Sequence, residues 1–543
     1  MEHKAPDTDE REFAFHDKNN ATAELAKGDV TLREEANEAT AEEHSATLLG
    51  AISKHRKAVA WAGVVSLCII MDGYDSALMG SLFGFPAFQK YYGHSIGHGK
   101  YQLDPKWQSA LGFASPIGNL IGVTVNGIGT DHFGHKPVLI WSMVALMGLV
   151  FIQFFATSVQ VLFVGQLLCG IPWGIFSTLA PGYASEVAPL ALRSYFETWV
   201  VCCWGIGQFV SYAVLFSLQH RDDHWAFRIP FAIQWVWPVL ILPIVVFCPE
   251  SPWWYVRQNR LQDARKSIER LMNNHTNELA DAPEKQLALM ITTDRLEREA
   301  NEGTSYWDCF RRSDIWRTEV ACISWGSQIL TGFVISGFST YFFEQAGLAS
   351  SSAFKMTLGM GGIHLLCNGL SAAISGNYGR RRPYMIGCFF MAILQIIIGI
   401  LAAVGGSKSL GYATSAVFLI WYAVWCLTLG PLPYVINSEV SSTRLRSKTF
   451  VLARGTYIVL NIVNSVVSPY LLNPTAANWK GKTGFLTGGL NALCLLWAFM
   501  RLPETANRTF EELDILFTTK GINARNFGKA EIAREGEEVS VSF

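Results

Sequence analysis

The chain has 543 residues, of which 50% are hydrophobic and 16% are charged, and its formal net charge is −1. Soluble globular proteins carry roughly 25% charged residues, so this composition argues against a soluble class. A net charge so close to zero gives no reason to expect a nucleic-acid partner.

An N-terminal segment of polar residues, 1–57, precedes the first apolar run. It is rich in Glu, Asp, Ala and Thr and contains no apolar stretch that resembles a cleavable signal. We therefore expect this segment to be a disordered tail that lies in the cytoplasm.

Apolar runs of about 20 residues, the length that crosses a bilayer as a helix, follow the tail. They predict twelve spans near 59–80, 109–130, 137–157, 161–182, 195–217, 231–248, 318–343, 355–376, 384–404, 412–436, 450–472 and 484–502. With twelve spans, the basic clusters at 54–57, 311–312, 380–382 and 444–448 all fall on the side of the tail. The positive-inside rule assigns this side, and with it both termini, to the cytoplasm.

A pattern of residues occurs twice, once in each half of the chain. The triplet Ser-Glu-Val contains Glu186, and Arg193 follows seven residues later; the same triplet returns with Glu439, and Arg446 follows at the same spacing. Two further markers repeat in the same order, at 134–137 and 379–383 and at 249–252 and 503–505. The chain therefore reads as two related halves.

These observations predict an all-α membrane protein with twelve transmembrane helices in two six-helix halves. The predicted domains are the tail 1–57, a first half 58–248, a cytoplasmic linker with short helices 249–317, a second half 318–502 and a cytoplasmic tail 503–543. Two such halves imply a central site that is opened to one side at a time by alternating access.

The ordered set of motifs resembles the sugar porter family of the major facilitator superfamily, from about residue 59 to 517. The motifs that show this resemblance are Gly127-x-x-x-Asp131-x-x-Gly134, the segment 183–193, Pro-Glu-Ser-Pro at 249–252 and Pro-Glu-Thr at 503–505. The segments 72–75, 166–173, 183–186 and 339–344 resemble fungal permeases for α-glucosides such as maltose, and lactose and cellobiose permeases share the general pattern. The resemblance implies the major facilitator fold.

Charged residues inside predicted spans are costly and usually functional, so Asp72, Asp75 and Arg454 are candidates for proton coupling. The alternative is a fixed ion pair that only orients helices. By resemblance, Asp75 matches the first-span Asp that family proton symporters protonate, and Arg454 is a candidate for its cationic partner. Gln166 stands where many proton-coupled members carry an Arg.

The resemblance also implies residues for sugar binding and for a cytoplasmic gate. Gln208, Gln328 and Asn461 match sugar-contacting positions, Tyr434 stands where many members have Trp, and Phe333 replaces the family's Asn. The gate set is Asp131, Glu186, Arg193, Arg380, Glu439 and Arg446, and the repeated Glu and Arg residues are placed to bridge helices when the cytoplasmic side is shut.

The function that follows is proton-coupled import of a disaccharide (maltose or another α-glucoside, lactose or cellobiose) across the plasma membrane. One alternative is a sugar sensor on a transporter fold with a cytoplasmic signalling partner, and another is a monosaccharide or polyol transporter. The sequence contains no catalytic motif and no Cys/His metal spacing, so no enzyme, metal or cofactor is expected. The expected partners are the sugar, protons and the lipid bilayer.

Overall fold

A computed structural model describes residues 50, 52, 55–97, 100–188, 192–272, 282–301, 305–404, 407–442, 444–506, 508, 510–519, 523–527, 531–535 and 538–542. Most of the predicted tail 1–57 lies outside these residues. The side chains of two candidate residues, Arg193 and Phe333, also lie outside the described part of the chain.

The N-terminal half consists of helices and one short hairpin. Its elements are α3 (Arg56–Ser66), α4 (Ile69–Leu82), α5 (Pro86–Tyr92), β1 (His94–Gly97), β2 (Lys100–Gln102), α6 (Pro105–Phe133), α7 (His135–Phe154), α8 (Val159–Val187), α9 (Arg193–Leu218), α10 (Trp225–Ile233) and α11 (Val236–Val246).

The segment between the halves forms short helices. They are α12 (Pro252–Arg257), α13 (Leu261–Leu271), α14 (Ala282–Asn301) and the 3₁₀ turn η3 (Tyr306–Phe310).

The C-terminal half repeats the helical plan, with more breaks. Its elements are α15 (Ile315–Gln328), the π-helical turn η4 (Ile329–Phe333), α16 (Val334–Gly337), α17 (Ser339–Gln345), α18 (Ser350–Tyr378), α19 (Arg381–Val404), α20 (Lys408–Leu427), α21 (Leu432–Val440), α22 (Arg446–Leu472), η5 (Lys480–Lys482) and α23 (Thr483–Arg501); α24 (Phe510–Thr518) and the hairpin β3 (Glu531–Glu535) with β4 (Glu538–Ser542) follow.

Ten helical segments in the described residues combine the length and the hydropathy needed to cross a membrane. The two remaining predicted spans correspond to the broken series from α15 to α17 and to the continuous helix α18. Irregular backbone at membrane depth is tolerated where it is enclosed by protein, which explains why a broken segment can serve as a span.

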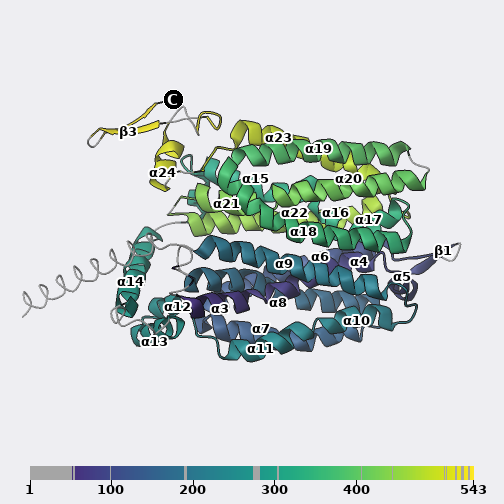
Figure 1. Cartoon of the computed structure of the whole chain (residues 1–543), viewed down its shortest axis with the longest axis horizontal. Coiled ribbons are helices and arrows are strands. Elements are labelled where there is room, and N and C mark those ends of the chain that lie inside the picture. Colours follow the sequence, from purple (N-terminus) through teal and green to yellow (C-terminus); the bar gives the residue numbers. More distant parts are fainter. Residues whose placement is uncertain are drawn as a thin grey trace, which may run out of the picture.

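The two halves lie side by side with their helices roughly parallel (Figure 1). The linker helices α12, α13 and α14 lie at one end of the bundle, here named the linker end, and β1 lies at the other, here named the hairpin end. Each half therefore contributes helix termini to both ends.

Small residues bring α6 and α8 into close contact within the first half. A Cβ atom on Gly118 would lie 2.1 Å from the carbonyl oxygen of Leu167, and one on Gly174 would lie 2.2 Å from that of Asn119. Because lipid supplies no hydrophobic drive for helices to associate, such close packing of small residues is a main source of stability in a membrane.

The break in the seventh span is held by side-chain hydrogen bonds. Gly332 has φ of 96°, in the left-handed region that favours glycine. Nearby, the amide Nε2 of Gln395 donates to the carbonyl oxygen of Thr331 at 2.6 Å. A backbone carbonyl freed by the break thus finds a partner inside the bundle.

The halves are joined by polar contacts at the hairpin end. The Ser109 hydroxyl donates to the carbonyl oxygen of Val466 at 2.8 Å. Asn473 Nδ2 donates to Gln108 Oε1 at 3.1 Å, and Gln102 donates to the Tyr341 hydroxyl. These contacts between α6 or β2 of one half and α22 or α17 of the other close the bundle at this end.

Aromatic rings and a glycine complete the closure. The ring of Phe83 stacks on that of Phe338 with 5.7 Å between centroids, and Phe85 meets Phe354 at 5.6 Å. At Gly80 a Cβ atom would stand 1.9 Å from the carbonyl oxygen of Gly337, so the two backbones touch. A larger residue at position 80 is incompatible with this closed arrangement.

Candidate functional site

The carboxylate of Asp75 is buried in the first half and hydrogen-bonded by glutamine amides. Asp75 lies on α4 and is 1% exposed. Gln166 on α8 donates from Nε2 to Asp75 Oδ2 at 2.7 Å, and Gln234, between α10 and α11, donates from Nε2 to Oδ1 at 3.0 Å. A third amide, Gln153 on α7, donates to Gln166 Oε1 at 2.8 Å.

Arg454 and Asp72 lie on opposite halves of the chain. Asp72 lies one helical turn before Asp75 on α4, within electrostatic range of Arg454 on α22, and accepts a hydrogen bond from the side chain of Trp204. The Arg454 guanidinium lies 4.8 Å from the ring centre of Trp325 and 4.7 Å from that of Tyr457. The structure therefore places Arg454 opposite Asp72, whereas Asp75 receives amide donors.

The candidate sugar residues differ in exposure and in the contacts they make. Gln208 is 5% exposed, and its Oε1 atom has no hydrogen-bond partner among the described residues. Tyr434 remains 41% exposed and stands 4.6 Å from the ring of Trp325. Asn461 is half-buried on α22. An unpaired amide oxygen and accessible aromatic faces are groups that bind sugar hydroxyls and C–H faces.

Gln328 is the candidate whose amide is engaged by the protein itself. Its Nε2 atom donates to the carbonyl oxygens of Leu429 at 3.1 Å and Gly430 at 2.5 Å, where α20 ends before α21. This side chain thus joins the seventh span to the interrupted tenth span, and a sugar would have to compete with those carbonyls for it.

His364 on α18 also lies between the halves. Its Nδ1 atom is 2.8 Å from the Tyr422 hydroxyl, and its ring is 5.5 Å from that of Trp204. The contacts of this imidazole are those of a packed side chain.

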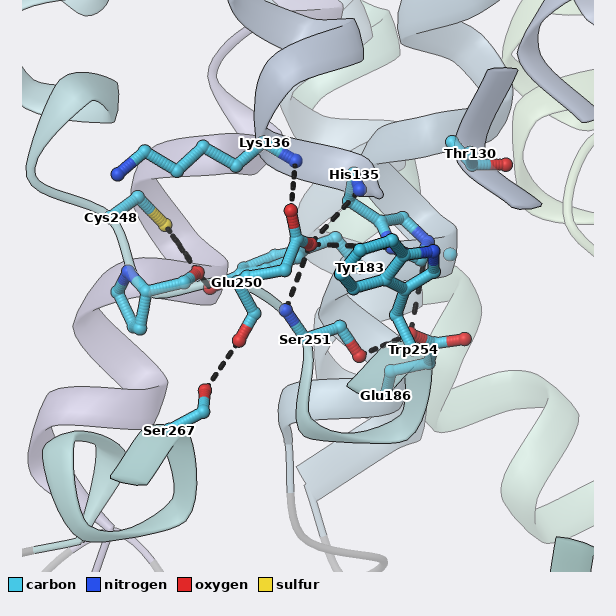
Figure 2. A network of polar contacts seen from close by, with 12 residues as sticks. Thr130, His135, Lys136, Tyr183, Glu186, Cys248, Glu250, Ser251, Trp254 and Ser267 are labelled. Carbon is cyan, nitrogen blue, oxygen red and sulfur yellow. Dashed lines mark hydrogen bonds and ion pairs between the residues drawn. The ribbon is translucent and has the colours of Figure 1, made fainter. Parts of the chain in front are cut away.

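A polar cluster at the linker end of the first half is built around Glu250 (Figure 2). The Glu250 carboxylate accepts the backbone N–H groups of His135 at 2.9 Å, Lys136 at 3.0 Å and Ser251 at 2.9 Å. Two of these donors begin α7, where unpaired N–H groups favour an anion. The carboxylate therefore fixes the turn between α6 and α7 to the start of the linker.

Glu186 closes the same cluster from the end of α8. It accepts hydrogen bonds from the Ser251 hydroxyl and from Arg257, and one of its oxygens lies 3.7 Å from His135 Nε2. His135 Nδ1 in turn lies 3.7 Å from Glu250. The imidazole is thus held between two carboxylates.

The second half contains a matching cluster. The Glu504 carboxylate accepts the backbone N–H groups of Arg380 at 2.8 Å and Arg381 at 3.1 Å. Glu439 accepts the guanidinium of Arg380 at 2.8 and 3.1 Å and the Thr505 hydroxyl at 2.6 Å. The repeat seen in the sequence is therefore a repeat of hydrogen bonds, with His135 in one half where Arg380 stands in the other.

The remaining gate candidates contribute less direct contacts. The carbonyl oxygen of Asp131 accepts from Trp254 Nε1 at 3.1 Å and from Gln258 Nε2 at 2.7 Å, while its side chain is exposed. Arg446 is half-buried at the start of α22. Glu186 is bonded to the start of the linker, and Glu439 is bonded to Arg380 in its own half and to Thr505 just beyond it, in a structure whose halves are joined at the hairpin end.

Several residues with central positions were not singled out from the sequence. Gln153 and Gln234 are polar residues inside predicted spans, and polar residues there usually have a functional role. Glu250 and Glu504 were quoted as parts of motifs without a role. In the described part of the chain no three His, Cys, Asp or Glu side chains are grouped as a metal site.

Two halves of membrane-crossing helices, with Asp75 buried inside one and with Asp72 and Arg454 on opposite halves, define a multi-pass membrane transporter. The chain belongs to the sugar (and other) transporter family, whose family model matches residues 61–517. Membership of a transporter family agrees with the expectation that the chain is not an enzyme.

Curated relatives are similar over most of their length. The general alpha-glucoside permease of Saccharomyces cerevisiae (strain ATCC 204508 / S288c) is 36% identical over 504 residues, which are 92% of this chain and 81% of the relative. The maltose permease MAL31 of the same strain is 35% identical over 512 residues, 92% of this chain and 82% of the relative.

Solved structures of the xylose transporter XylE from E. coli are similar in fold. Its partially occluded inward open form has a TM-score of 0.67 at 19% identity, covering 84% of this chain and 100% of that chain. The proton:xylose symporter XylE bound to 6-bromo-6-deoxy-D-glucose has a TM-score of 0.66 at 20% identity, covering 85% of this chain and 99% of that chain. The predicted major facilitator fold is thereby confirmed.

Proposed function

We propose that the chain imports an α-glucoside disaccharide, such as maltose, together with protons across the plasma membrane by alternating access. The observation that carries the proposal is that Asp72 and Arg454, on opposite halves of a sugar transporter, lie within electrostatic range of each other.

The substrate class rests on the relatives and on the chemistry around the ion pair. The relatives are an alpha-glucoside permease and a maltose permease. The free Oε1 atom of Gln208 supplies an acceptor, the exposed ring of Tyr434 supplies an aromatic face, and Asn461 supplies both donors and acceptors. These groups suit a ligand with many hydroxyls and apolar C–H faces.

The direction of opening follows from which end is closed. The halves meet at the hairpin end through Ser109, Gln108 and their partners. If the linker end faces the cytoplasm, as the basic clusters predict, this arrangement is the inward-facing state. Import then requires that the hairpin end opens and that the halves come together at the linker end, near the clusters of Glu186 and Glu439.

Proton coupling follows from the energetic cost of separating the opposite charges of Asp72 and Arg454. When the halves move, the attraction between Asp72 and Arg454 must be given up or rearranged. Protonation of Asp72 in an acidic outer medium removes that attraction and lowers the cost of the movement. Asp75, buried among amides one helical turn away, is the second carboxyl that could carry a proton.

Two alternatives from the sequence differ in what they require. A sugar sensor would need a signalling partner, and the tail segment 1–57 that could reach one lies mostly outside the described residues. A monosaccharide or polyol transporter would need only a different pocket chemistry. The family and the relatives favour transport of a disaccharide.

The test is uptake of labelled maltose by yeast cells that lack their own maltose and hexose transporters and express this chain. Uptake is measured at outside pH 5 and pH 7, with and without a proton uncoupler, and with localisation checked by a fluorescent tag. Accumulation that collapses with the uncoupler is expected. Uptake that only equilibrates the sugar would refute proton coupling, and no uptake of any sugar by a correctly localised protein would favour the sensor.

A further inference from the structure

The Asp75 carboxylate sits in a surrounding of neutral amides. Three glutamines, which are 1% to 4% exposed, approach it from α7, α8 and the junction of α10 and α11. A buried carboxylate is costly unless it is paired and hydrogen-bonded. Here one amide N–H group occupies each carboxylate oxygen, at 2.7 and 3.0 Å.

The two donors to Asp75 differ in how firmly they are held. Gln166 donates to Asp75 with Nε2 and accepts from Gln153 with Oε1, so both ends of its amide are used. The Oε1 atom of Gln234 is buried and has no hydrogen-bond partner among the described residues. Gln166 is therefore a fixed donor, while Gln234 keeps an unused acceptor beside the carboxyl group.

That unused acceptor matters when Asp75 takes up a proton. The carboxyl group then becomes an O–H donor and needs an acceptor. The terminal amide torsion of glutamine is broad, so a half-turn of the Gln234 amide exchanges its N–H for its oxygen. The proton adds to Oδ1, the O–H donates to Gln234 Oε1, and no covalent bond is broken.

Gln234 lies where a rotation of its amide can affect neighbouring helices. It lies between α10 and α11, its backbone N–H donates to the carbonyl oxygen of Phe231 at 3.1 Å, and the next residue, Trp235, donates from Nε1 to the carbonyl oxygen of Met147 at 2.9 Å. The proton site is thus connected to the break in the sixth span and to α7.

Other titratable groups face Asp75 from two elements. Asp72 and Tyr74 share α4 with it, and the Tyr74 hydroxyl donates to the carbonyl oxygen of Pro230 at 2.8 Å. Cys169 faces it from α8. From α7 and the junction of α10 and α11 the facing groups are the neutral amides of Gln153 and Gln234.

We propose that Gln166 and Gln234 are positioning residues that set proton binding at Asp75 in place of a cation, Gln166 as a fixed donor and Gln234 as a donor that becomes an acceptor. This inference rests on the proposed proton coupling. Amide donors favour the ionised carboxylate, so removing Gln166 should keep the carboxyl protonated to higher pH. Removing Gln234, which also accepts from the protonated form, should have a smaller effect.

The test is the pH profile of maltose uptake for Gln166→Met and Gln234→Met, which keep side-chain length and remove the amide. The pH of half-maximal uptake should rise by about one unit for Gln166→Met, about tenfold in proton concentration, which is the difference between a charged and a neutral hydrogen bond. It should rise by less for Gln234→Met, because Gln234 also accepts from the protonated carboxyl group. Gln166→Arg supplies a cation and should lower it. In an Asp75→Asn background the same substitutions should no longer shift the profile.

Controls separate this inference from the proposed function. Asn491→Leu removes a buried amide of the second half, which donates to Gln395 at 3.3 Å, and should leave the pH profile unchanged. Sugar counterflow, which needs no net proton movement, checks that each variant folds and alternates. Uncoupler-insensitive uptake by the unaltered protein would overturn both proposals. Coupled uptake whose pH profile stays the same in Gln166→Met, Gln234→Met and Gln166→Arg would overturn this inference alone.

Discussion

Substitution of Gly134 by alanine should disrupt the linker end of the first half. Gly134 has φ of 90° and ψ of 171°, a combination that is almost exclusive to glycine. A Cβ atom there would lie 2.5 Å from Glu250 Oε2. The backbone strain costs on the order of 1–3 kcal/mol, and loss of one charged hydrogen bond from the displaced carboxylate costs about 1.5–3 kcal/mol more.

The total, roughly 3–6 kcal/mol, is a large part of the stability of a domain. We expect Gly134→Ala to lower the melting temperature of the purified protein, measured with a thiol-reactive dye that reports exposure of its buried cysteines, and to lower maltose uptake. Gly379, with φ of 79° and a Cβ position 2.7 Å from Glu504, should behave alike.

The matched control is Gly148→Ala, because Gly148 lies within α7 and a Cβ atom there meets nothing within 4 Å. Alanine in a helix interior is favoured over glycine, so this variant should be neutral or slightly stabilising. If Gly134→Ala melts at the same temperature as Gly148→Ala and transports as well, the assigned role of the Glu250 cluster is wrong.

Three further predictions concern the closed end, the ion pair and the repeated cluster. Gly80→Val should prevent closure against Gly337 and favour the state that is open at the hairpin end. Backbone amides at that end should then exchange hydrogen faster, and sugar import should be slower. Arg454→Gln should reduce uptake at least tenfold by leaving Asp72 without its cation inside a membrane span, and Asp72→Asn in the same protein should restore sugar counterflow but not accumulation. A double variant no better than the single one would argue against this electrostatic interaction. Arg380→His should lower the melting temperature because imidazole cannot make the two-point contact with the facing carboxylate, and an unchanged melting curve would contradict that reasoning.

Much of the fold could be predicted from the sequence because a bilayer imposes simple rules. Each span must satisfy its own backbone and be about 20 residues long, so apolar runs revealed the twelve predicted spans. The repeated motifs around Gly134 and Gly379 indicated two halves. The break in the seventh span was not foreseen, since the partners of its freed backbone, such as Gln395, come from another helix.

The candidate site was predictable only as a set of costly residues. Burial of a charge is expensive wherever it occurs, so Asp72, Asp75 and Arg454 stood out from the residue types alone. Which charge meets which partner depends on how helices far apart in the sequence are rotated and packed. The tertiary structure alone decided that Arg454 faces Asp72, that Asp75 is held by Gln166 and Gln234, and that the halves close at the hairpin end.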